Sequence, residues 1–332
     1  MNSLKWKKYH PLTDKNAFIC LVDHMGDDSA IVQAARVSYG KDENRITANE
    51  AINSDYARFQ DFEEQLKKDR QLIRYLMNHS HTTPFEMVEI KFMVQVPMDC
   101  WRQWIRHRTA SVNEYSTRYT EALDFFQVTS PEEWRLQATD NKQGSSGFLE
   151  EWPEEAQYSY NSDNDASTLR FKDNCSLTHL DYEGELNPGK LLSEHEEDFH
   201  YHAKQIYKQR LLFGIAKEQA RKDLPLSTYT RAYWKCDLHN IFNFLRLRMD
   251  NHAQLEIRSF ANCMFEIVKQ LCPVACEAFE DYVLNAKRFS RMEMGVLKAF
   301  VQGPDSTYLN FHKYKPDSMT DREWKEFLGK LQ

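Results

Sequence analysis

The residues of this chain that could do chemistry gather between Arg106 and Tyr119, in the string RHRTASVNEYSTRY. They are too polar for a core, and their spacing is too uneven for one face of a helix. Arginine offers a planar, permanently charged fork that binds a phosphate or a carbonyl pair through two hydrogen bonds. Arg106, Arg108 and Arg118 are therefore candidate clamps for an anionic ligand. Glu114 could pair with one of them or accept a hydrogen bond from a ribose hydroxyl.

The charge distribution favours a small anionic ligand over a nucleic acid. The net charge of −7 argues against a general nucleic-acid binder. Residues 131–200 hold 17 acidic and 5 basic residues, a balance of −12, which leaves +5 for the rest of the chain. A mildly basic scaffold suits nucleotides. The alternative, an RNA- or DNA-binding module that uses the Arg/Tyr-rich segment with aromatic stacking, requires a wide basic face.

Composition predicts a folded, soluble protein, because 41% of the 332 residues are hydrophobic and 28% are charged. The beginning MNSLKWKKYH lacks an apolar signal region, and the longest apolar runs, 17–22 and 211–216, are too short to span a bilayer. We therefore expect a cytoplasmic location without a membrane partner. Seven cysteines without CxxC spacing indicate neither a disulfide framework nor a cysteine zinc site. Neither GxGxxG nor a P-loop occurs, so a bound dinucleotide must be held in another way.

Several elements before and after the polar segment must position it. Strict alternation predicts a half-buried strand over 88–96, and Pro97 begins a helix that runs into Arg106. Other predictions are strands at 17–22 and 227–236 and helices at 30–38, 56–77, 194–222, 238–249, 253–271 and 292–301. This mixture without regular strand–helix alternation indicates an α+β class. Periodicity fades over 131–192, which we interpret as an acidic insertion, partly loop.

The string at 106–119 matches R-H-R-x-x-S-x-N-E-x-S-x-R-Y at all nine fixed positions and thereby resembles the signature of flavin-dependent thymidylate synthases. Four further blocks resemble that family in the same order: AARVSYG at 34–40, HTTPFEMVEIKF at 81–92, ARKDLPLSTYTRAYW at 220–234 and NFLRLRMDNHAQLEIR at 243–258. The resemblance covers roughly 30–128 and 200–285. It implies a mostly antiparallel central sheet flanked by helices, in one domain of 1–130 and 193–287, with 131–192 as the insertion and 288–332 as a C-terminal extension.

The resemblance also implies an activity and an assembly. It implies a homotetramer whose active sites are shared between subunits. Each site would make dTMP from dUMP, with methylenetetrahydrofolate as the carbon donor and NADPH reducing the FAD cofactor. The protein would supply binding, orientation and electrostatics, while the cofactor carries the redox chemistry.

By resemblance, a set of polar residues binds FAD: His81, Thr83, Glu86, Arg106, His107, Arg108, Glu114, Asp237, His239 and Asn243. One stretch departs from the pattern, since some family members have Asn-x-Arg where this chain has Asp237-Leu238-His239. The flavin contacts of those two outer residues are therefore predicted to be different, although the backbone can still serve.

The resemblance places a second set of residues around dUMP: Gln103, Trp104, Ile105, Arg106, Glu114, Tyr115, Ser116, Thr117, Arg118, Arg221 and Arg248. Arg248 matches an arginine that stabilises the ionised N3 of uracil, which makes C5 more nucleophilic. A fixed cation beside that developing charge is the catalytic contribution we expect. Ser116 is the second catalytic candidate, but positioning of dUMP is favoured over covalent attack because no base is assigned to it.

Two other hypotheses stay open at this point. A metallohydrolase could use His195, His200 and His202, but these histidines lack HExxH spacing and lie at the edge of the insertion. The second hypothesis is a family member that keeps the fold but has lost its activity. The intact motif, together with Arg221 and Arg248, argues against this hypothesis.

Overall fold

The computed structural model describes residues 4–38, 40, 46–54, 56–139, 144–152, 157–161, 166–170, 176–180, 187–302, 314–316 and 320–331. The chain divides into two compact units, Met1–Cys276 and Glu277–Gln332. The first unit contains the central sheet and every predicted site residue. The second is described by itself below.

A four-stranded antiparallel sheet forms the centre of the first unit, in the order β1-β2-β9-β3. Its strands are β1 Phe18–Met25, β2 Glu89–Pro97, β9 Tyr229–Asp237 and β3 Ser111–Glu114. The predicted alternation in β2 is confirmed, because Ile90, Phe92 and Val94 are fully buried while Lys91 and Met93 are half-buried. The expected α+β fold with a mostly antiparallel sheet is confirmed.

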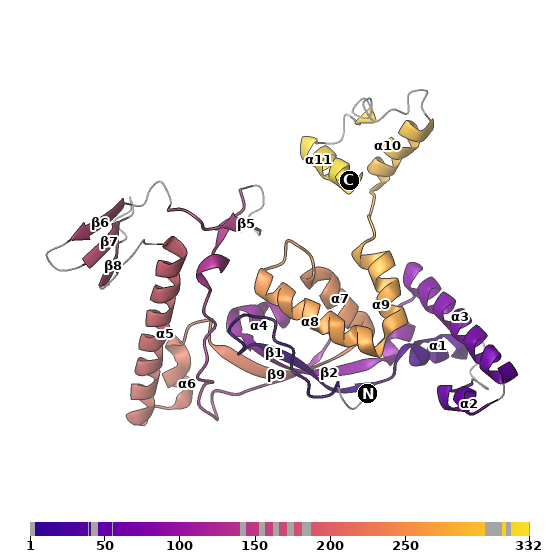
Figure 1. The fold of residues 1–332 in the computed structure, drawn as a ribbon, viewed down its shortest axis with the longest axis horizontal. Coiled ribbons are helices and arrows are strands. Elements are labelled where there is room, and N and C mark those ends of the chain that lie inside the picture. Colours follow the sequence, from indigo (N-terminus) through magenta and orange to yellow (C-terminus); the bar gives the residue numbers. More distant parts are fainter. Residues whose placement is uncertain are drawn as a thin grey trace. The chain divides into compact units, whose positions relative to one another are not determined.

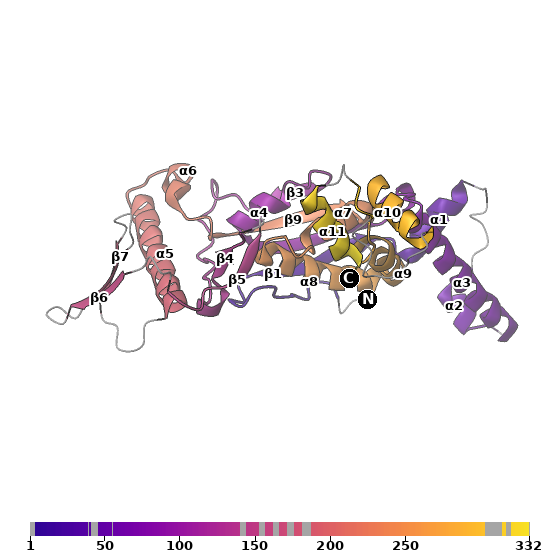
Figure 2. The same ribbon diagram turned by 90° about the horizontal axis from the view of Figure 1, so that it is seen from above.

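Helices cover the apolar face of this sheet (Figures 1 and 2). They are α4 Met98–Trp104, α7 Leu238–Arg248 and α8 Leu255–Leu271. Between them and the sheet lies an aromatic core, in which the Trp104 ring packs against Phe244 at 4.8 Å, Trp234 at 5.7 Å and Phe260 at 5.8 Å between ring centroids. This core fixes α4 and α7 against the sheet, and both helices end in site residues.

Further helices precede β2. They are α1 Asp28–Val37, α2 Ala48–Ile52, α3 Tyr56–Asn78 and the 3-10 turn η1 Thr83–Met87. η1 packs against the start of α7, where Leu238 N donates to Val88 O at 2.8 Å and the rings of Phe85 and Phe242 lie 6.4 Å apart. The HTTPFE block is therefore held beside α7.

The acidic region contains short strands that the sequence pattern did not predict. η2 Pro131–Glu133 precedes β4 Arg135–Gln137 and β5 Ser145–Phe148, which pair with each other, and β6 Gln157–Asn161, β7 Ala166–Arg170 and β8 Ser176–Leu180 form a separate sheet. None of these described strands joins the central sheet. Arg135 ties the start of the region to the core through two bonds to the carboxylate of buried Glu256, at 2.6 and 2.9 Å.

The helix predicted over 194–222 is wrong in extent. α5 spans Pro188–Leu212, and the chain then turns at Gly214, whose φ of +74° is a left-handed conformation that glycine adopts without strain. The short helix α6 Lys217–Ala220 and the 3-10 turn η3 Arg221–Asp223 follow. Apolar periodicity continues across this turn, so it did not reveal the break.

The end of the chain leads from the first unit into the second through α9 Pro273–Phe279 and the π-helical turn η4 Glu280–Leu284. The second unit contains α10 Arg291–Gln302 and α11 Asp321–Leu331. Buried Val296, Trp324 and Phe327 form a small core of its own. The predicted helix at 292–301 is confirmed.

Candidate functional site

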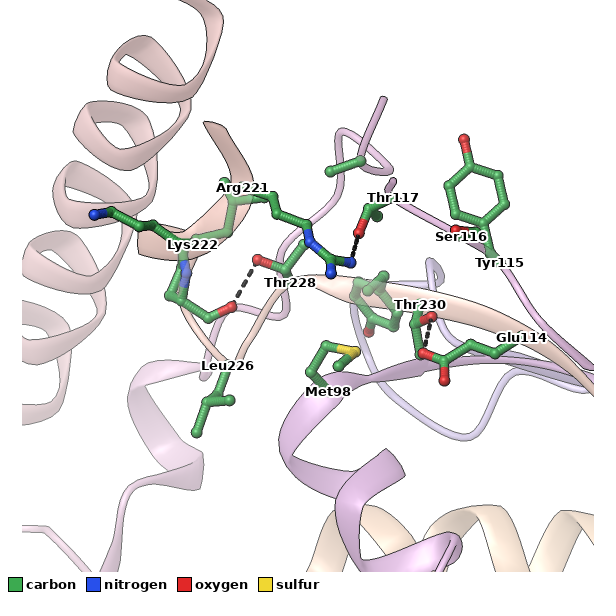
Figure 3. A pocket seen from close by; sticks show the side chains of 14 residues that line it. Met98, Glu114, Tyr115, Ser116, Thr117, Arg221, Lys222, Leu226, Thr228 and Thr230 are labelled. Carbon is green, nitrogen blue, oxygen red and sulfur yellow. Dashed lines mark hydrogen bonds between the residues drawn. The ribbon is translucent and has the colours of Figure 1, made fainter. Parts of the chain in front are cut away.

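A cavity of about 530 Å³ lies where the second half of the motif passes beside the start of β9 (Figure 3). The motif contributes Glu114, Tyr115, Ser116 and Thr117 to its lining. The other lining residues used below are Met98 at the start of α4, Arg221 and Lys222 from η3, and Leu226, Thr228, Tyr229 and Thr230. Two basic residues and several hydroxyl-bearing residues thus line one concave space, a composition suited to a nucleotide.

Hydrogen bonds hold the polar lining in place. Arg221 Nη1 donates to Thr117 Oγ1 at 2.5 Å, and Thr230 Oγ1 donates to Glu114 Oε1 at 2.8 Å (Figure 3). The first bond orients a guanidinium toward the cavity, and the second leaves one oxygen of Glu114 to accept from a ligand. No described residue hydrogen-bonds to Ser116 Oγ, so the structure provides no base that would activate it as a nucleophile.

A second group of site residues, the arginine cluster, consists of Gln103, Arg106, His107 and Arg248. Arg248 Nε donates to His107 Nε2 at 3.1 Å, and Arg248 Nη2 has a long contact of 3.5 Å with the backbone oxygen of Gln103. The chain turn after α4 and the end of α7 therefore meet. None of these four described side chains lines the cavity.

His107 is held as a neutral acceptor within the arginine cluster. Burial, and secondarily the charge of Arg248, lowers its pKa from 6.5 to about 4. Because a guanidinium only donates, Nε2 of His107 must be the unprotonated nitrogen and Nδ1 carries the hydrogen. The ring packs edge-on against Phe244, with centroids 4.9 Å apart. Burial and the nearby charge of Arg106 lower the pKa of Arg248 as well.

The predicted flavin residues outside the 106–119 segment lie in or just before η1 and at the start and on the exposed side of α7. His81 and Thr83 are exposed, and Glu86 is half-buried. His239 and Asn243 lie four residues apart on α7 and so share one side of the helix, with Arg246 Nη2 donating to Asn243 Oδ1 at 3.1 Å. Because η1 packs against the start of α7, these residues lie around one end of the β2–β9 pair.

Three predicted site residues, Asp237, Arg118 and Trp104, have other contacts in this chain. The carboxylate of Asp237 caps α7 by accepting from N and Nδ2 of Asn240, at 2.9 and 2.8 Å. Arg118 pairs with Glu218 at 3.1 Å. The Trp104 side chain is fully buried in the aromatic core, so a ligand could reach only its backbone. The side chains of Ile105 and Arg108, in contrast, are exposed.

Sequence reasoning did not identify several residues of the site. Lys222, Tyr229 and Thr230 lie in the family-like block 220–234, in which the resemblance implies a ligand contact for Arg221 alone. Tyr229 OH donates to Asp14 Oδ2 at 2.6 Å, and burial raises the pKa of this phenol well above its usual range. Position within a family-like block was the signal available for these three residues. The bond between Tyr229 and Asp14 joins residues more than two hundred positions apart, so no local pattern reveals it.

The histidines of the metallohydrolase hypothesis make other contacts. His200 Nε2 lies 2.7 Å from Ser227 Oγ, and its ring stacks on Phe126. Within the described ranges, no three His, Cys, Asp or Glu residues are grouped so that they could hold a metal ion. Among the described helices, none has the length and apolar character needed to cross a bilayer.

The class of protein follows from comparison of the whole domain with known families. The family model of the thymidylate synthase complementing protein matches residues 20–274, which include all but the first two residues of the central sheet, the cavity and the arginine cluster.

Curated relatives narrow this class. The flavin-dependent thymidylate synthase of Wolbachia pipientis wMel is 39% identical over 322 residues, covering 97% of this chain and 92% of that protein. The enzyme of the same name from Dictyostelium discoideum is 41% identical over 271 residues, covering 82% of this chain and 71% of that protein. The chain belongs to the family of flavin-dependent thymidylate synthases.

Solved structures agree with this membership. The UMP/dUMP methylase PolB from Streptomyces cacaoi, bound with 5-Br dUMP, is 27% identical and superimposes with a TM-score of 0.59, covering 81% of this chain and 96% of that chain. The same methylase bound with 5-Br UMP gives a TM-score of 0.58. Nothing among these relatives favours a nucleic-acid-binding module.

Proposed function

We propose that this enzyme makes dTMP from dUMP with FAD as its cofactor, methylenetetrahydrofolate as the carbon donor and NADPH as the reductant. The observation that carries the proposal is the cavity walled by Glu114, Tyr115, Ser116 and Thr117 of the motif, with Arg221 directed into it. A guanidinium beside hydroxyl groups suits a nucleotide phosphate and sugar. The neighbours that were solved with brominated UMP and dUMP support the same ligand class.

The residues on the exposed side of α7 and on η1 fit FAD. Exposed Arg106 and Arg108 can neutralise its pyrophosphate, and Thr83 and Asn243 can bond its polar groups. His81, Glu86, His107, Glu114 and His239 complete the set, with Asp237 contributing through its backbone because its carboxylate caps α7. When bound, FAD supplies the redox chemistry of the reaction.

Arg248 is the residue to which we assign catalysis. Two contacts, with His107 Nε2 and with the Gln103 backbone, restrict its guanidinium, so the cation is oriented before the substrate arrives. A preorganised cation stabilises charge that develops on the uracil ring without reorganisation cost. Ser116, which has no base, positions the nucleotide, and Arg118 binds it after exchanging Glu218 for the ligand.

We further propose that the active site is shared between subunits of a homotetramer. In one described chain, five of the predicted nucleotide residues line the cavity, and three others, Gln103, Arg106 and Arg248, lie in the arginine cluster outside it. A symmetric assembly can bring the arginine cluster of one subunit to the cavity of another.

Subunit complementation tests the shared site. Arg221→Met inactivates the cavity half, and Arg248→Ala inactivates the cluster half. When the two variants are unfolded, mixed and reassembled, random mixing gives about a quarter of the sites two intact halves, so about a quarter of wild-type activity should return. Mixtures that stay inactive, although mixed tetramers form, would contradict shared sites.

We also propose that 131–192 is an insertion into the domain formed by 1–130 and 193–287, that 288–332 is an extension, and that the enzyme works in the cytoplasm. Mutual pairing of the insertion's described strands supports the first point. Deleting residues 140–190, which retains Arg135, should leave FAD binding intact. Loss of flavin from a correctly folded deletion variant would show that the segment belongs to the site.

A further inference from the structure

Helix α4 connects the two halves of the site. Its first residues are bonded to the cavity wall, because Met98 N donates to Thr228 O at 3.0 Å and Asp99 N donates to Leu226 O at 3.1 Å. Its last turn carries Gln103 of the arginine cluster. A residue at the start of α4 can therefore influence both halves.

A chain of side-chain hydrogen bonds runs from Asp99 to Gln103 through Gln254, which lies just before α8. Gln254 Nε2 donates to Asp99 Oδ2 at 3.0 Å, and Gln103 Nε2 donates to Gln254 Oε1. All three side chains are half-buried. The direction of the hydrogen bonds follows from chemistry, because a carboxylate only accepts, so Gln254 directs its NH₂ toward Asp99.

That direction determines what Gln103 offers a ligand. Since Oε1 of Gln254 faces Gln103, the amide of Gln103 must direct Nε2 toward that oxygen. Its own Oε1 makes no hydrogen bond to any described residue. The side chain therefore presents a fixed acceptor rather than a fixed donor.

We propose that Asp99 and Gln254 are positioning residues that hold Gln103 so that its Oε1 accepts a hydrogen bond from a donor group of the bound nucleotide, either the imide N3–H of the unreacted base, before N3 ionises, or the 3′-hydroxyl. This inference rests on the proposed function, in which Gln103 contacts dUMP. The pair acts through Gln103 and does not touch the substrate.

The experiment breaks and then restores this hydrogen-bond chain in the FAD-loaded enzyme. Gln254→Glu places two carboxylates against each other, and their repulsion displaces the new glutamate from Asp99 and from its bond with Gln103. In the double variant Asp99→Asn with Gln254→Glu, the new asparagine amide donates, the new glutamate accepts from both neighbours, and the total charge equals that of the wild type. Asp99 Oδ1 is buried and has no hydrogen-bond partner among the described residues, so the amide oxygen of the new asparagine can occupy its place.

We expect Gln254→Glu to weaken dUMP binding, measured by calorimetry, by roughly tenfold, and the double variant to recover most of that loss. Flavin content and melting temperature serve as folding controls. Gln270→Glu, the same chemical change on an exposed part of α8, should bind dUMP like wild type.

Two substrate analogues locate the donor. For dUMP, the dissociation constant of Gln254→Glu should be roughly ten times that of the wild type. This ratio should fall to about one for one of two analogues, N3-methyl-dUMP or 2′,3′-dideoxy-UMP, namely the one that lacks the group that Gln103 contacts. Unchanged dUMP affinity in Gln254→Glu, no recovery in the double variant, or a full ratio with both analogues would overturn the inference. Failure of the wild-type enzyme to bind dUMP would instead refute the proposed function.

Discussion

Replacing His107 by glutamine should remove a pH-dependent loss of stability that this side chain causes in the wild-type enzyme. In the folded protein the pKa of His107 lies near 4 instead of 6.5, because its ring is buried and lies beside Arg248. Below pH 6.5 the unfolded chain therefore binds a proton that the folded chain excludes. Stability due to this group is fully present above pH 6.5 and is lost as the pH falls toward 4.

The size of the effect follows from the two pKa values. They give a loss of about 1.8 kcal/mol in the free energy of unfolding between pH 7 and pH 5, which partial exposure of the ring reduces to roughly 1 kcal/mol. Glutamine is uncharged at both pH values and can still accept from Arg248 Nε, so His107→Gln should not show this loss.

The assay is urea unfolding at pH 7 and pH 5, followed by tryptophan fluorescence at one protein concentration. The difference between wild type and variant isolates His107, because other groups titrate equally in both proteins. The variant should gain roughly 1 kcal/mol relative to wild type on going from pH 7 to pH 5. A difference that stays constant, or changes in the opposite direction, would refute the neutral, Arg248-bound state of His107.

Other perturbations have equally definite outcomes. Arg248→Ala should retain FAD absorption but lower the rate of dTMP formation at least about a hundredfold, and normal turnover would refute its catalytic role. Arg135→Met should lower the free energy of unfolding in urea by about 3 kcal/mol, because it leaves buried Glu256 unpaired. Adding Glu256→Gln should recover much of this loss, and an unaffected single variant would contradict the pairing. Burial raises the pKa of Asp28 to about 6, so this carboxyl should lower wild-type stability by roughly 2 kcal/mol as the pH rises from 4 to 7, and Asp28→Asn should abolish that contribution.

Much of the scaffold could be predicted because its signals are local. The alternation in β2 is a property of consecutive residues, and α7 and α8 show their apolar sides at helical spacing. The motif at 106–119 likewise identified the family and the cavity wall from contiguous sequence. Local pattern was sufficient for β2, α7 and α8, each of which buries one side, but not for the bounds of α5 or for the buried helix α9.

Other features depend on distant parts of the chain. All four residues of β3 are exposed, so no apolar pattern marks this strand, and its pairing with β9 alone makes it one. Gln254 and Gln103 are 151 residues apart, and their bond arises only when α8 packs against α4. Trp104 differs in another way: it lies within a predicted ligand-binding stretch, but its side chain is buried and packs in the core.

The central claim is tested most directly by following dTMP formation from dUMP in the presence of methylenetetrahydrofolate and NADPH, before and after FAD is stripped from the purified protein. We predict a yellow protein that forms dTMP, loses this activity with its flavin and regains it when FAD is added back. A colourless protein that binds no FAD on reconstitution, or dTMP formation that persists without flavin, would contradict the account.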